Sequence, residues 1–380
     1  MRRHAVERDI PCLTAIDTAN AIANCLKSKY NAENVELVDI NCLRRTKQML
    51  HFAKMDSTGN DFIVIDAMTQ AVNNPAGLAV RLCDRLNGGI GADSLVLIEH
   101  SSVADAKMRF FNQDGSEGRM AGNAIRCVGK FLYDNDIDGI TEKHGRKTDA
   151  TEKITIETEA GVKTLVLYKQ NGKVTSVTVD MGAPYFEPEK LPTLLEARAL
   201  SPLNLVAGSN AEEVKRAVSA GLLPETAIVN APLSLDEQAE NGGSGAESES
   251  ALSYRVTCVG VGNPHCVVFS HFVDKEPLAE IGPKFEHHKM FPERTNTEFV
   301  RVVGPNELKM RTWERGNGET LACGTGACAA AVAAVLNGYS PLGEDITVRV
   351  RGGTLHVCYT GGSVLLTGET RLCFEGSIEI

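Results

Sequence analysis

The sequence lacks clustered basic residues and long apolar runs, and each absence excludes a class of function. Its formal net charge is −10, from 39 Lys and Arg against 49 Asp and Glu in 380 residues. Because contacts to nucleic-acid phosphates require clustered cations, we expect no nucleic-acid partner. No apolar run approaches the roughly 18 residues of a membrane span, and no signal-peptide pattern opens the chain. We therefore expect a cytoplasmic protein without a membrane partner.

The cysteines also lack a pattern that would indicate disulfides or zinc. There are eleven, an odd number, with no CxxC pair. We expect no metal site, and we expect most of these thiols to be small buried hydrophobic groups. P-loop and Rossmann fingerprints are missing as well, which predicts a protein without a bound cofactor.

One cysteine, Cys323, differs from the others because it lies in a glycine-rich loop at the start of a predicted helix. Residues 314–328 read ERGNGETLACGTGAC, and the Ala/Val run that follows is apolar on every side, which predicts a buried helix ending at Asn337-Gly338. Free N–H groups at a helix start attract anions and favour thiolate over thiol. The segment therefore predicts a carboxylate cradle beside an activated sulfur.

A second copy of this pattern lies earlier in the chain. Met108 precedes Ala121 by 13 residues, and Met310 precedes Cys323 by 13. At the same shift of 202 positions the pairs are Phe111 with Trp313, Asn112 with Glu314 and Glu117 with Glu319, and Gly59-Asn60 matches Gly262-Asn263 at a shift of 203. This register predicts an internal duplication with two similar halves facing each other. The position equivalent to Cys323 is Ala121, which has no acid–base chemistry.

The periodicity predicts an α/β (α+β) fold of two pseudo-symmetric domains, each with a mixed or antiparallel sheet around a central helix. We assign residues 49–180, with about 368–380, to the first domain and 181–367 to the second. Residues 1–48 form an extension to which we assign no function, and residues 191–252 are predicted to be a mobile insertion. Expected helices are 76–86, 123–133 and 211–220, and expected strands are 62–65, 94–98, 107–111, 153–159, 162–169, 173–180, 253–261, 266–269, 296–303 and 308–313.

A thiolate beside an anion cradle, facing a second helix start, suits proton removal from the carbon next to an amino acid's carboxylate. Converging N–H donors stabilise the negative charge that develops in this step. Inversion of that carbon requires one group on each face, and two thiols on opposing halves would supply them.

Several motifs in order resemble those of diaminopimelate epimerase. They are residues 57–62 (STGNDF), 89–93 (GIGAD), 111–116 (FNQDGS), 122–123 (GN), 262–265 (GNPH), 295–296 (TN) and 314–328, and the likeness covers residues 49–380. The resemblance implies an isomerase of lysine biosynthesis that needs no pyridoxal cofactor. It implies interconversion of LL-2,6-diaminopimelate and meso-diaminopimelate by two-base proton transfer between two cysteines, and a homodimer.

The resemblance also implies the roles of individual residues. Cys323 is one acid–base thiol, and His265 and Glu314 tune the thiols. Arg315 would pair with a substrate carboxylate and Glu314 with an ammonium. The remaining implied substrate-binding residues are Asn60, Asn112, Gly122, Asn123, Asn263, Asn296, Gly324 and Thr325. Taken one by one, such residues are more often turn or surface groups, but the ordered set favours the functional interpretation.

The sequence departs from the family at Ala121, where the resemblance implies the second cysteine. Cys127 is six residues further along the predicted helix and on a different face, so we expect it in the core. Turnover should fall while substrate binding survives. Two alternatives remain open: a proline-type 3-hydroxy amino-acid dehydratase, for which one base suffices, and a non-catalytic binder of diaminopimelate.

Overall fold

A computed structural model describes residues 48–143, 151–196, 226–235 and 253–380. Residues His51–Ile378 belong to one compact unit. The predicted extension up to residue 47, the predicted helix at 211–220 and most of the predicted insertion lie outside the described residues.

The first run of strands contains two main helices. α3 is Pro75–Cys83 and α4 is Gly122–Asp134, followed by a 3₁₀ turn, η1 (Ile137–Gly139), and a short α5 (Ile140–Lys143). The strands are β1 Met49–Ser57, β2 Asn60–Asp66, β3 Ser94–Glu99, β4 Ala106–Asn112, β5 Glu117–Gly118, β6 Glu152–Thr158, β7 Gly161–Gln170 and β8 Lys173–Asp180.

The second run also contains two main helices. α7 is Leu278–Glu286 and α8 is Gly324–Leu336, with a 3₁₀ turn, η4, at Val273–Lys275. The strands are β9 Ala231–Ser234, β10 Ser253–Gly260, β11 Pro264–Phe269, β12 Asn296–Gly304, β13 Glu307–Glu314, β14 Gly318–Thr320, β15 Asp345–Val350, β16 Gly353–Tyr359, β17 Val364–Glu369 and β18 Arg371–Glu379.

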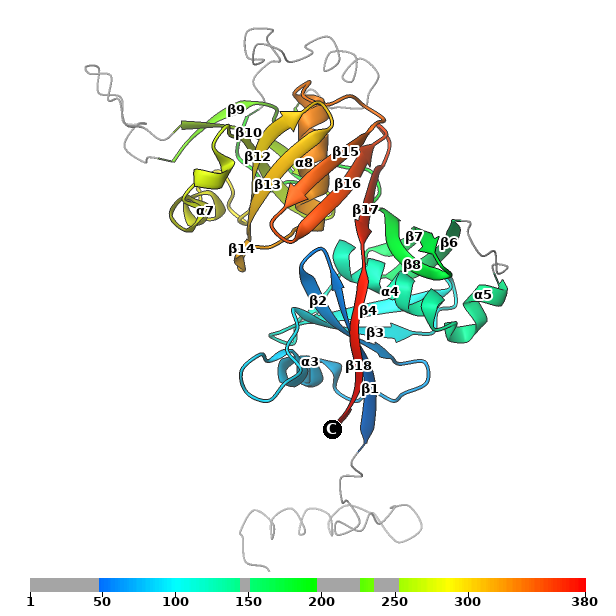
Figure 1. The fold of residues 1–380 in the computed structure, drawn as a ribbon. Coiled ribbons are helices and arrows are strands. Elements are labelled where there is room, and N and C mark those ends of the chain that lie inside the picture. The colour runs from blue at the N-terminus through cyan, green and yellow to red at the C-terminus, as the bar shows by residue number, and fades with distance from the viewer. Residues whose placement is uncertain (1–47, 144–150, 197–225, 236–252) are drawn as a thin grey trace, which may run out of the picture. The chain divides into compact units, whose positions relative to one another are not determined.

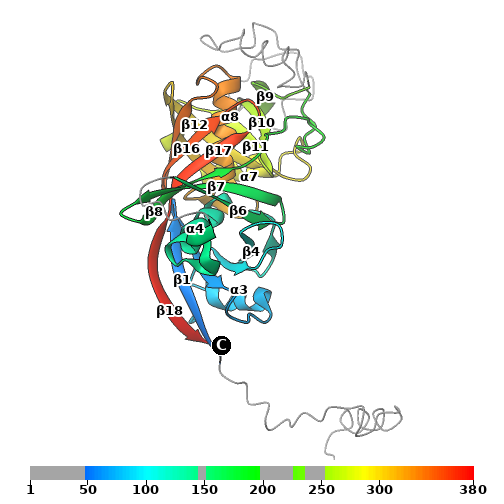
Figure 2. The same cartoon turned by 90° about the vertical axis from the view of Figure 1, so that its right-hand side faces the viewer.

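The order of strand pairing occurs twice. β1 and β2 are antiparallel, β2 and β3 parallel, β3 and β4 antiparallel, β4 and β6 parallel, and β6, β7 and β8 antiparallel in turn. The same alternation runs through β10, β11, β12, β13, β15, β16 and β17. β8 pairs with β17, and β18 returns to pair with β1, as Figures 1 and 2 show. The duplicated α+β architecture predicted from the sequence is confirmed.

α4 and α8 occupy equivalent places in the two runs of strands. Each spans 13 residues, and each ends at an asparagine whose side chain donates to a carbonyl four residues earlier: Asn135 to Phe131 at 3.0 Å and Asn337 to Ala333 at 2.8 Å. Every α8 residue except Thr325 is buried, which confirms the prediction made from its uniform apolar composition. It packs against β10, β12, β13 and β16 (Figure 1).

α7 was absent from the sequence predictions, because Gly282 and Pro283 lower helix propensity in its interior. The glycine has a packing reason. A Cβ at Gly282 would lie 2.3 Å from the Trp313 ring, whose Nε1 donates to Glu286 at 2.8 Å. β9 was also unpredicted; it lies within the segment assigned to the insertion and pairs with β10.

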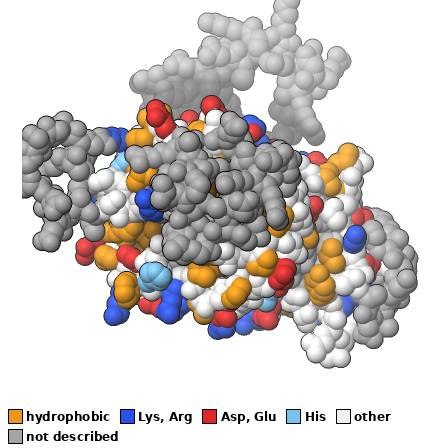
Figure 3. All heavy atoms as spheres, turned by 90° about the horizontal axis from the view of Figure 1, so that it is seen from above, with side chains coloured by type: hydrophobic (Ala, Val, Ile, Leu, Met, Phe, Trp, Pro, Cys, Tyr) orange, Lys and Arg blue, Asp and Glu red, His pale blue; other side chains and the backbone are white. Residues whose placement is uncertain are grey.

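None of the helices among the described residues is long and apolar enough to cross a membrane. On the face drawn in Figure 3, Lys and Arg side chains lie among acidic and apolar ones instead of forming one block.

Candidate active site

Cys323 is the N-cap residue of α8, in extended conformation at φ −123° and ψ 112°. Its Sγ accepts a hydrogen bond from the Gly326 N–H at 3.3 Å and lies 3.4 Å from Thr325 Oγ1. The residue is 6% exposed. The sulfur is therefore held over the first turn of the helix, where free N–H groups gather.

Ala121 is the N-cap residue of α4 and has nearly the same backbone conformation, with φ −135° and ψ 114°. Its methyl group makes no capping bond. A cysteine side chain at this position would therefore leave the backbone in the same direction relative to α4 as Cys323 does relative to α8.

The two helix starts converge on one side chain. A Cβ added at Gly122 or at Gly324 would in each case lie 3.2 Å from Leu366 Cδ2. The Gly324 position is also 3.0 Å from Asn123 Oδ1. Glycine at both places lets the first turns approach this closely. The predicted facing arrangement of the two glycine-led starts is thus present within the compact unit.

Cys127 lies in the core, as predicted. It is fully buried, and burial raises the pKa of its thiol to about 12. Its Sγ accepts a hydrogen bond from Thr370 Oγ1 at 3.2 Å. It cannot replace the thiol that is missing at position 121.

The pKa of Cys323 is raised, whereas the sequence predicted an activated sulfur. Burial is the main cause that raises this pKa well above its usual value, and the nearby Glu314 and Glu298 carboxylates raise it further. The bonds with Thr325 and Gly326 act in the opposite direction, as a helix start should, but they are outweighed. The prediction of an activated thiolate is wrong for this state, because the neutral thiol is the favoured form.

His265 lies in a buried polar group beside the α8 start. Its Nδ1 is 2.8 Å from Glu298 Oε1, and its Nε2 is 2.9 Å from Asn263 Oδ1. Glu298 is fully buried, and its Oε2 has no hydrogen-bond partner among the described residues. Gly326 is required here because a Cβ would lie 2.6 Å from Glu298 Oε1. Glu298 was not predicted from the sequence, although its place two residues after Asn296 on β12 puts both on one face of the strand.

The turn after β13 holds three more predicted residues. Glu314 accepts from Thr320 Oγ1, and burial is the chief cause of its raised pKa. Asn296 is buried, and its Oδ1 accepts from the Arg315 backbone N–H at 2.8 Å. The Arg315 side chain is exposed and donates to the Glu293 carbonyl at 3.1 Å.

Among the predicted asparagines of the first run of strands, Asn60 and Asn123 lie together. Asn123 Nδ2 donates to Asn60 Oδ1, and Asn60 Nδ2 donates to Asp93 Oδ2 at 3.0 Å. Asn112 is exposed and instead closes its own turn, with its Nδ2 2.9 Å from Ser116 Oγ.

Comparison with known proteins decides the family. A profile of the family described as Diaminopimelate epimerase matches residues 52–187 and 257–372. The chain belongs to the diaminopimelate epimerase family. A diaminopimelate epimerase of Desulfovibrio desulfuricans is 42% identical over 333 residues, which cover 87% of this chain and 99% of that protein. One from Methanococcus maripaludis is 41% identical over 333 residues, covering 87% and 100%. The resemblance stated from the motifs, the isomerase class and the link to lysine biosynthesis are confirmed.

Solved structures share the fold of this epimerase-family chain. A hydroxyproline epimerase from Agrobacterium vitis matches with a TM-score of 0.56 at 14% identity, over 88% of this chain and 94% of that one. A PhzF-family protein from Bacillus anthracis matches with a TM-score of 0.54 at 14% identity, over 88% and 100%. At these identities the likeness concerns the fold alone.

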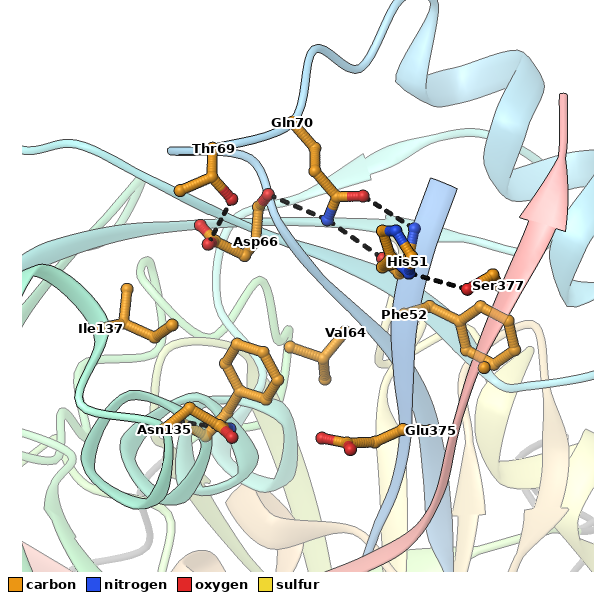
Figure 4. Close-up of a pocket in the computed structure, with 12 residues that line it drawn as sticks. His51, Phe52, Val64, Asp66, Thr69, Gln70, Asn135, Ile137, Glu375 and Ser377 are labelled. Atoms are coloured by element: carbon orange, nitrogen blue, oxygen red, sulfur yellow. Dashed lines mark hydrogen bonds between the residues drawn. The ribbon is translucent and has the colours of Figure 1, made fainter. Parts of the chain in front are cut away.

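A pocket of about 550 Å³, lined by other residues, is also present in this member of the diaminopimelate epimerase family (Figure 4). Figure 4 shows Gln70 and Ser377 bonded to His51 at its rim, each at 2.7 Å. None of the residues predicted for catalysis or substrate binding lines it.

The raised pKa of Cys323 predicts a pH dependence that can be measured directly. We expect Cys323 to titrate above pH 9.0, with the thiolate fraction rising as pH increases. Replacing Glu298 by Gln removes one of the anions that raise this pKa, so titration should move to lower pH. Thiolate absorbance near 240 nm, taken as the difference from a Cys323→Ser variant, measures both; a midpoint below 9.0 in the unmodified chain would contradict the assignment.

Proposed function

We propose that this family member is an amino-acid epimerase framework that lacks one of its two acid–base groups. It would bind diaminopimelate at the paired helix starts, and Cys323, after passing its own proton to solvent, would exchange the α-proton on one face only. Interconversion of the LL and meso forms would require a thiol at position 121. The observation that carries the proposal is the convergence of the α4 and α8 starts on Leu366, with sulfur on one and a methyl group on the other.

The chemistry follows from charge at the reacting carbon. Removing the α-proton moves negative charge onto the substrate's carboxylate, where preorganised N–H donors stabilise the transition state more than the ground state. We propose that the first-turn N–H groups of Gly122 and Asn123, and of Gly324 and Thr325, supply these donors. The side chains of Asn60 and Asn123 are already oriented by their mutual hydrogen bond, which reduces reorganisation on binding.

The distal end of the substrate would be recognised by the turn after β13. Diaminopimelate has an ammonium and a carboxylate at each end, so it needs two sets of charged partners. We propose that Glu314 pairs with an ammonium and Arg315 with the distal carboxylate. Asn296 would support this turn through its bond to the Arg315 backbone. We propose tuning of Cys323 by His265 and Glu314, and substrate contacts from Asn263 and Asn112.

We retain the predicted division into residues 49–180 with about 368–380 and residues 181–367 as a proposal. The repeated strand order and the return of β18 to β1 support it.

The test is stereochemical. The chain and an Ala121→Cys variant are incubated with LL-diaminopimelate and, separately, with meso-diaminopimelate in D₂O, and inversion and α-deuterium are measured separately. We expect deuterium without inversion from the chain, and inversion from the variant. Failure of the variant to invert would contradict the proposal, and release of water from hydroxyproline would favour the dehydratase alternative.

We further propose a cytoplasmic homodimer in which β18 lies at the interface. Leu372 and Phe374 are two residues apart on this strand, so their side chains share one face, and they are 46% and 50% exposed. Phe374 packs edge-on against Phe52 of β1, with ring centroids 6.1 Å apart. Apolar surface of this kind is typical of the centre of a subunit interface.

A Leu372→Lys, Phe374→Lys double variant tests this surface. Two buried ammonium groups on each side of a two-fold interface would repel, so we expect the variant to be monomeric where the unmodified chain is dimeric. Light scattering after size exclusion gives the mass. A Leu342→Lys variant is the control, because Leu342 is 47% exposed in a loop outside β18. An unmodified chain that is itself monomeric, or a double variant that stays dimeric, would contradict the proposal.

A further inference from the structure

Arg126, in the second turn of α4, is a buried cation without an anionic partner. Its side chain is fully buried. It donates to four neutral oxygens: Asn123 Oδ1 at 2.7 Å, Ser57 Oγ at 3.0 Å, Thr58 Oγ1 at 3.1 Å and the Gly122 carbonyl at 3.3 Å. No carboxylate among the described residues lies within ion-pair distance of its guanidinium. The positive charge is thus left uncompensated directly behind the start of α4.

Such a charge opposes folding. Burial lowers the pKa of Arg126 to about 10, so the group stays protonated at neutral pH but loses most of its hydration. A buried charge without a counterion destabilises the folded state unless its hydrogen bonds compensate for the lost water. Its presence therefore needs a reason beyond packing.

The duplicated helix shows that the fold does not require this group. At the shift of 202 positions the counterpart of Arg126 is Cys328, which is also fully buried. α8 nevertheless has the same length and the same N-cap conformation as α4. A guanidinium is therefore not needed to build a glycine-led helix start in this architecture.

Arg126 also determines the orientation of two predicted substrate-binding amides. Its Nη2 donates to Asn123 Oδ1, so the Asn123 amide presents its Nδ2 to Asn60 Oδ1. The Asn60 amide in turn presents its Nδ2 to Asp93 at 3.0 Å. The bonds run in one direction from a cation to a carboxylate, and such chains polarise each member. Each amide keeps one further N–H for a ligand.

The two helix starts consequently differ in electrostatic character. The α4 start has the Arg126 cation behind it, whereas the buried Glu298 carboxylate lies beside the first turn of α8, close to Gly326. An anionic group placed between the two starts would be attracted mainly by α4.

We propose that Arg126 is a positioning residue that makes the α4 start the principal anion-binding end of the site and fixes the Asn123 and Asn60 amides toward the substrate's reacting carboxylate. The inference rests on the proposed function. The charge acts through the helix start and the two amides, and it favours the additional negative charge that develops on the carboxylate when the α-proton leaves.

The experiment uses the full chain in two backgrounds, unmodified and Ala121→Cys. In each background Arg126 is replaced by Gln and by Lys. Gln keeps N–H hydrogen-bond donors but removes the charge, whereas Lys keeps the charge but loses the planar array of guanidinium N–H donors. A Ser57→Ala, Thr58→Val double variant removes two of the hydrogen bonds that Arg126 donates, together with the bond from Ser57 Oγ to the Glu369 carbonyl, and leaves the charge in place. Arg349→Gln is the matched control, because it removes the same charge from an exposed strand position. Thermal unfolding reports folding, calorimetry reports the Kd of diaminopimelate, and kcat and KM are measured with the Ala121→Cys proteins.

We expect Arg126→Gln to lower kcat by about 10- to 100-fold in the Ala121→Cys background, with a smaller change in KM. Arg126→Lys should recover most of the lost rate. The Ser57, Thr58 variant and the Arg349 control should stay within about threefold of their parent, because the helix-start charge is retained. In the unmodified background Arg126→Gln should weaken diaminopimelate binding.

Each other outcome has a distinct meaning. Gln and Lys variants that are folded and equally active as the parent would overturn the role of Arg126 alone. If kcat fell equally in the Gln, Lys and Ser57, Thr58 variants, Arg126 would act only through its hydrogen bonds, and the electrostatic role would be overturned. If Arg126→Gln fails to fold, the Lys variant and the Ser57, Thr58 variant still show whether the charge of Arg126 or its hydrogen bonds are required. A parent that neither inverts nor binds diaminopimelate overturns the proposed function, and this inference with it.

Discussion

An Ala121→Cys variant should convert LL-diaminopimelate to the meso form about 10²- to 10⁴-fold faster than the unmodified chain, the range that one general acid–base group contributes. The physical reason is geometric. Ala121 and Cys323 occupy the same N-cap position on equivalent helices, with backbone angles that differ by 12° in φ (−135° against −123°) and 2° in ψ (114° against 112°). A thiol at residue 121 would therefore meet the first-turn N–H groups of α4 as Cys323 meets those of α8.

The matched control is Ala121→Ser, which adds a polar side chain of similar size without an accessible thiolate. We expect it to bind diaminopimelate and to remain close to the unmodified chain in its rate of inversion, because a hydroxyl is a far weaker acid than a thiol. Chiral chromatography of the product gives the rate. Equal rates for the Cys and Ser variants would exclude the two-thiol arrangement.

A cysteine at residue 121 should also change how deuterium enters the substrate. With Cys323 alone, exchange returns the label to the same face, so α-deuterium accumulates without inversion in the isomer whose α-hydrogen faces Cys323. With two thiols, the second group delivers solvent hydrogen to the opposite face, so label should accumulate in newly formed meso product. The ratio of the two labelled isomers therefore reports the second group directly.

Features that depend on the local sequence pattern could be predicted. The α8 helix could be predicted because an Ala/Val run on every face is compatible only with burial. Its start was visible in the glycines around Cys323, and the duplication followed from equal spacing. Asn123 could be assigned by position, and the structure places it against Gly324.

The sequence was uninformative where long-range packing decides the outcome. Arg126 and Glu298 are read from the sequence as ordinary charged residues of a helix and a strand, yet both are fully buried. Their burial depends on contacts far along the chain, such as the bond from Arg126 to Ser57, 69 positions away. The pKa of Cys323 was predicted in the wrong direction for the same reason, because the helix start is a local feature while burial and the Glu298 and Glu314 charges come from tertiary structure.

Replacing Cys323 by Ala should remove proton transfer on the Cys323 face of the substrate in both backgrounds. In the unmodified chain it removes the one proposed base, so α-deuterium exchange should fall to the uncatalysed rate. In the Ala121→Cys background it leaves a thiol on the α4 side alone, so inversion should fall by about 10²- to 10⁴-fold while exchange on one face persists. If single-face exchange persists, the variant has lost one acid–base group and the site is otherwise intact.

Cys328→Ala is the matched control, because Cys328 lies five residues further along the same helix and is fully buried. Its loss should cost stability of about 1 kcal/mol through a small cavity, and should leave both exchange and inversion near the parent rate. Calorimetric binding of diaminopimelate completes the comparison: Cys323→Ala should retain binding, since the anion-binding helix starts and the Asn60 and Asn123 amides are unchanged. If Cys323→Ala and Cys328→Ala proved equally active, the thiol at the start of α8 would have no part in proton transfer, and the convergence of the two helix starts would need a different chemical explanation.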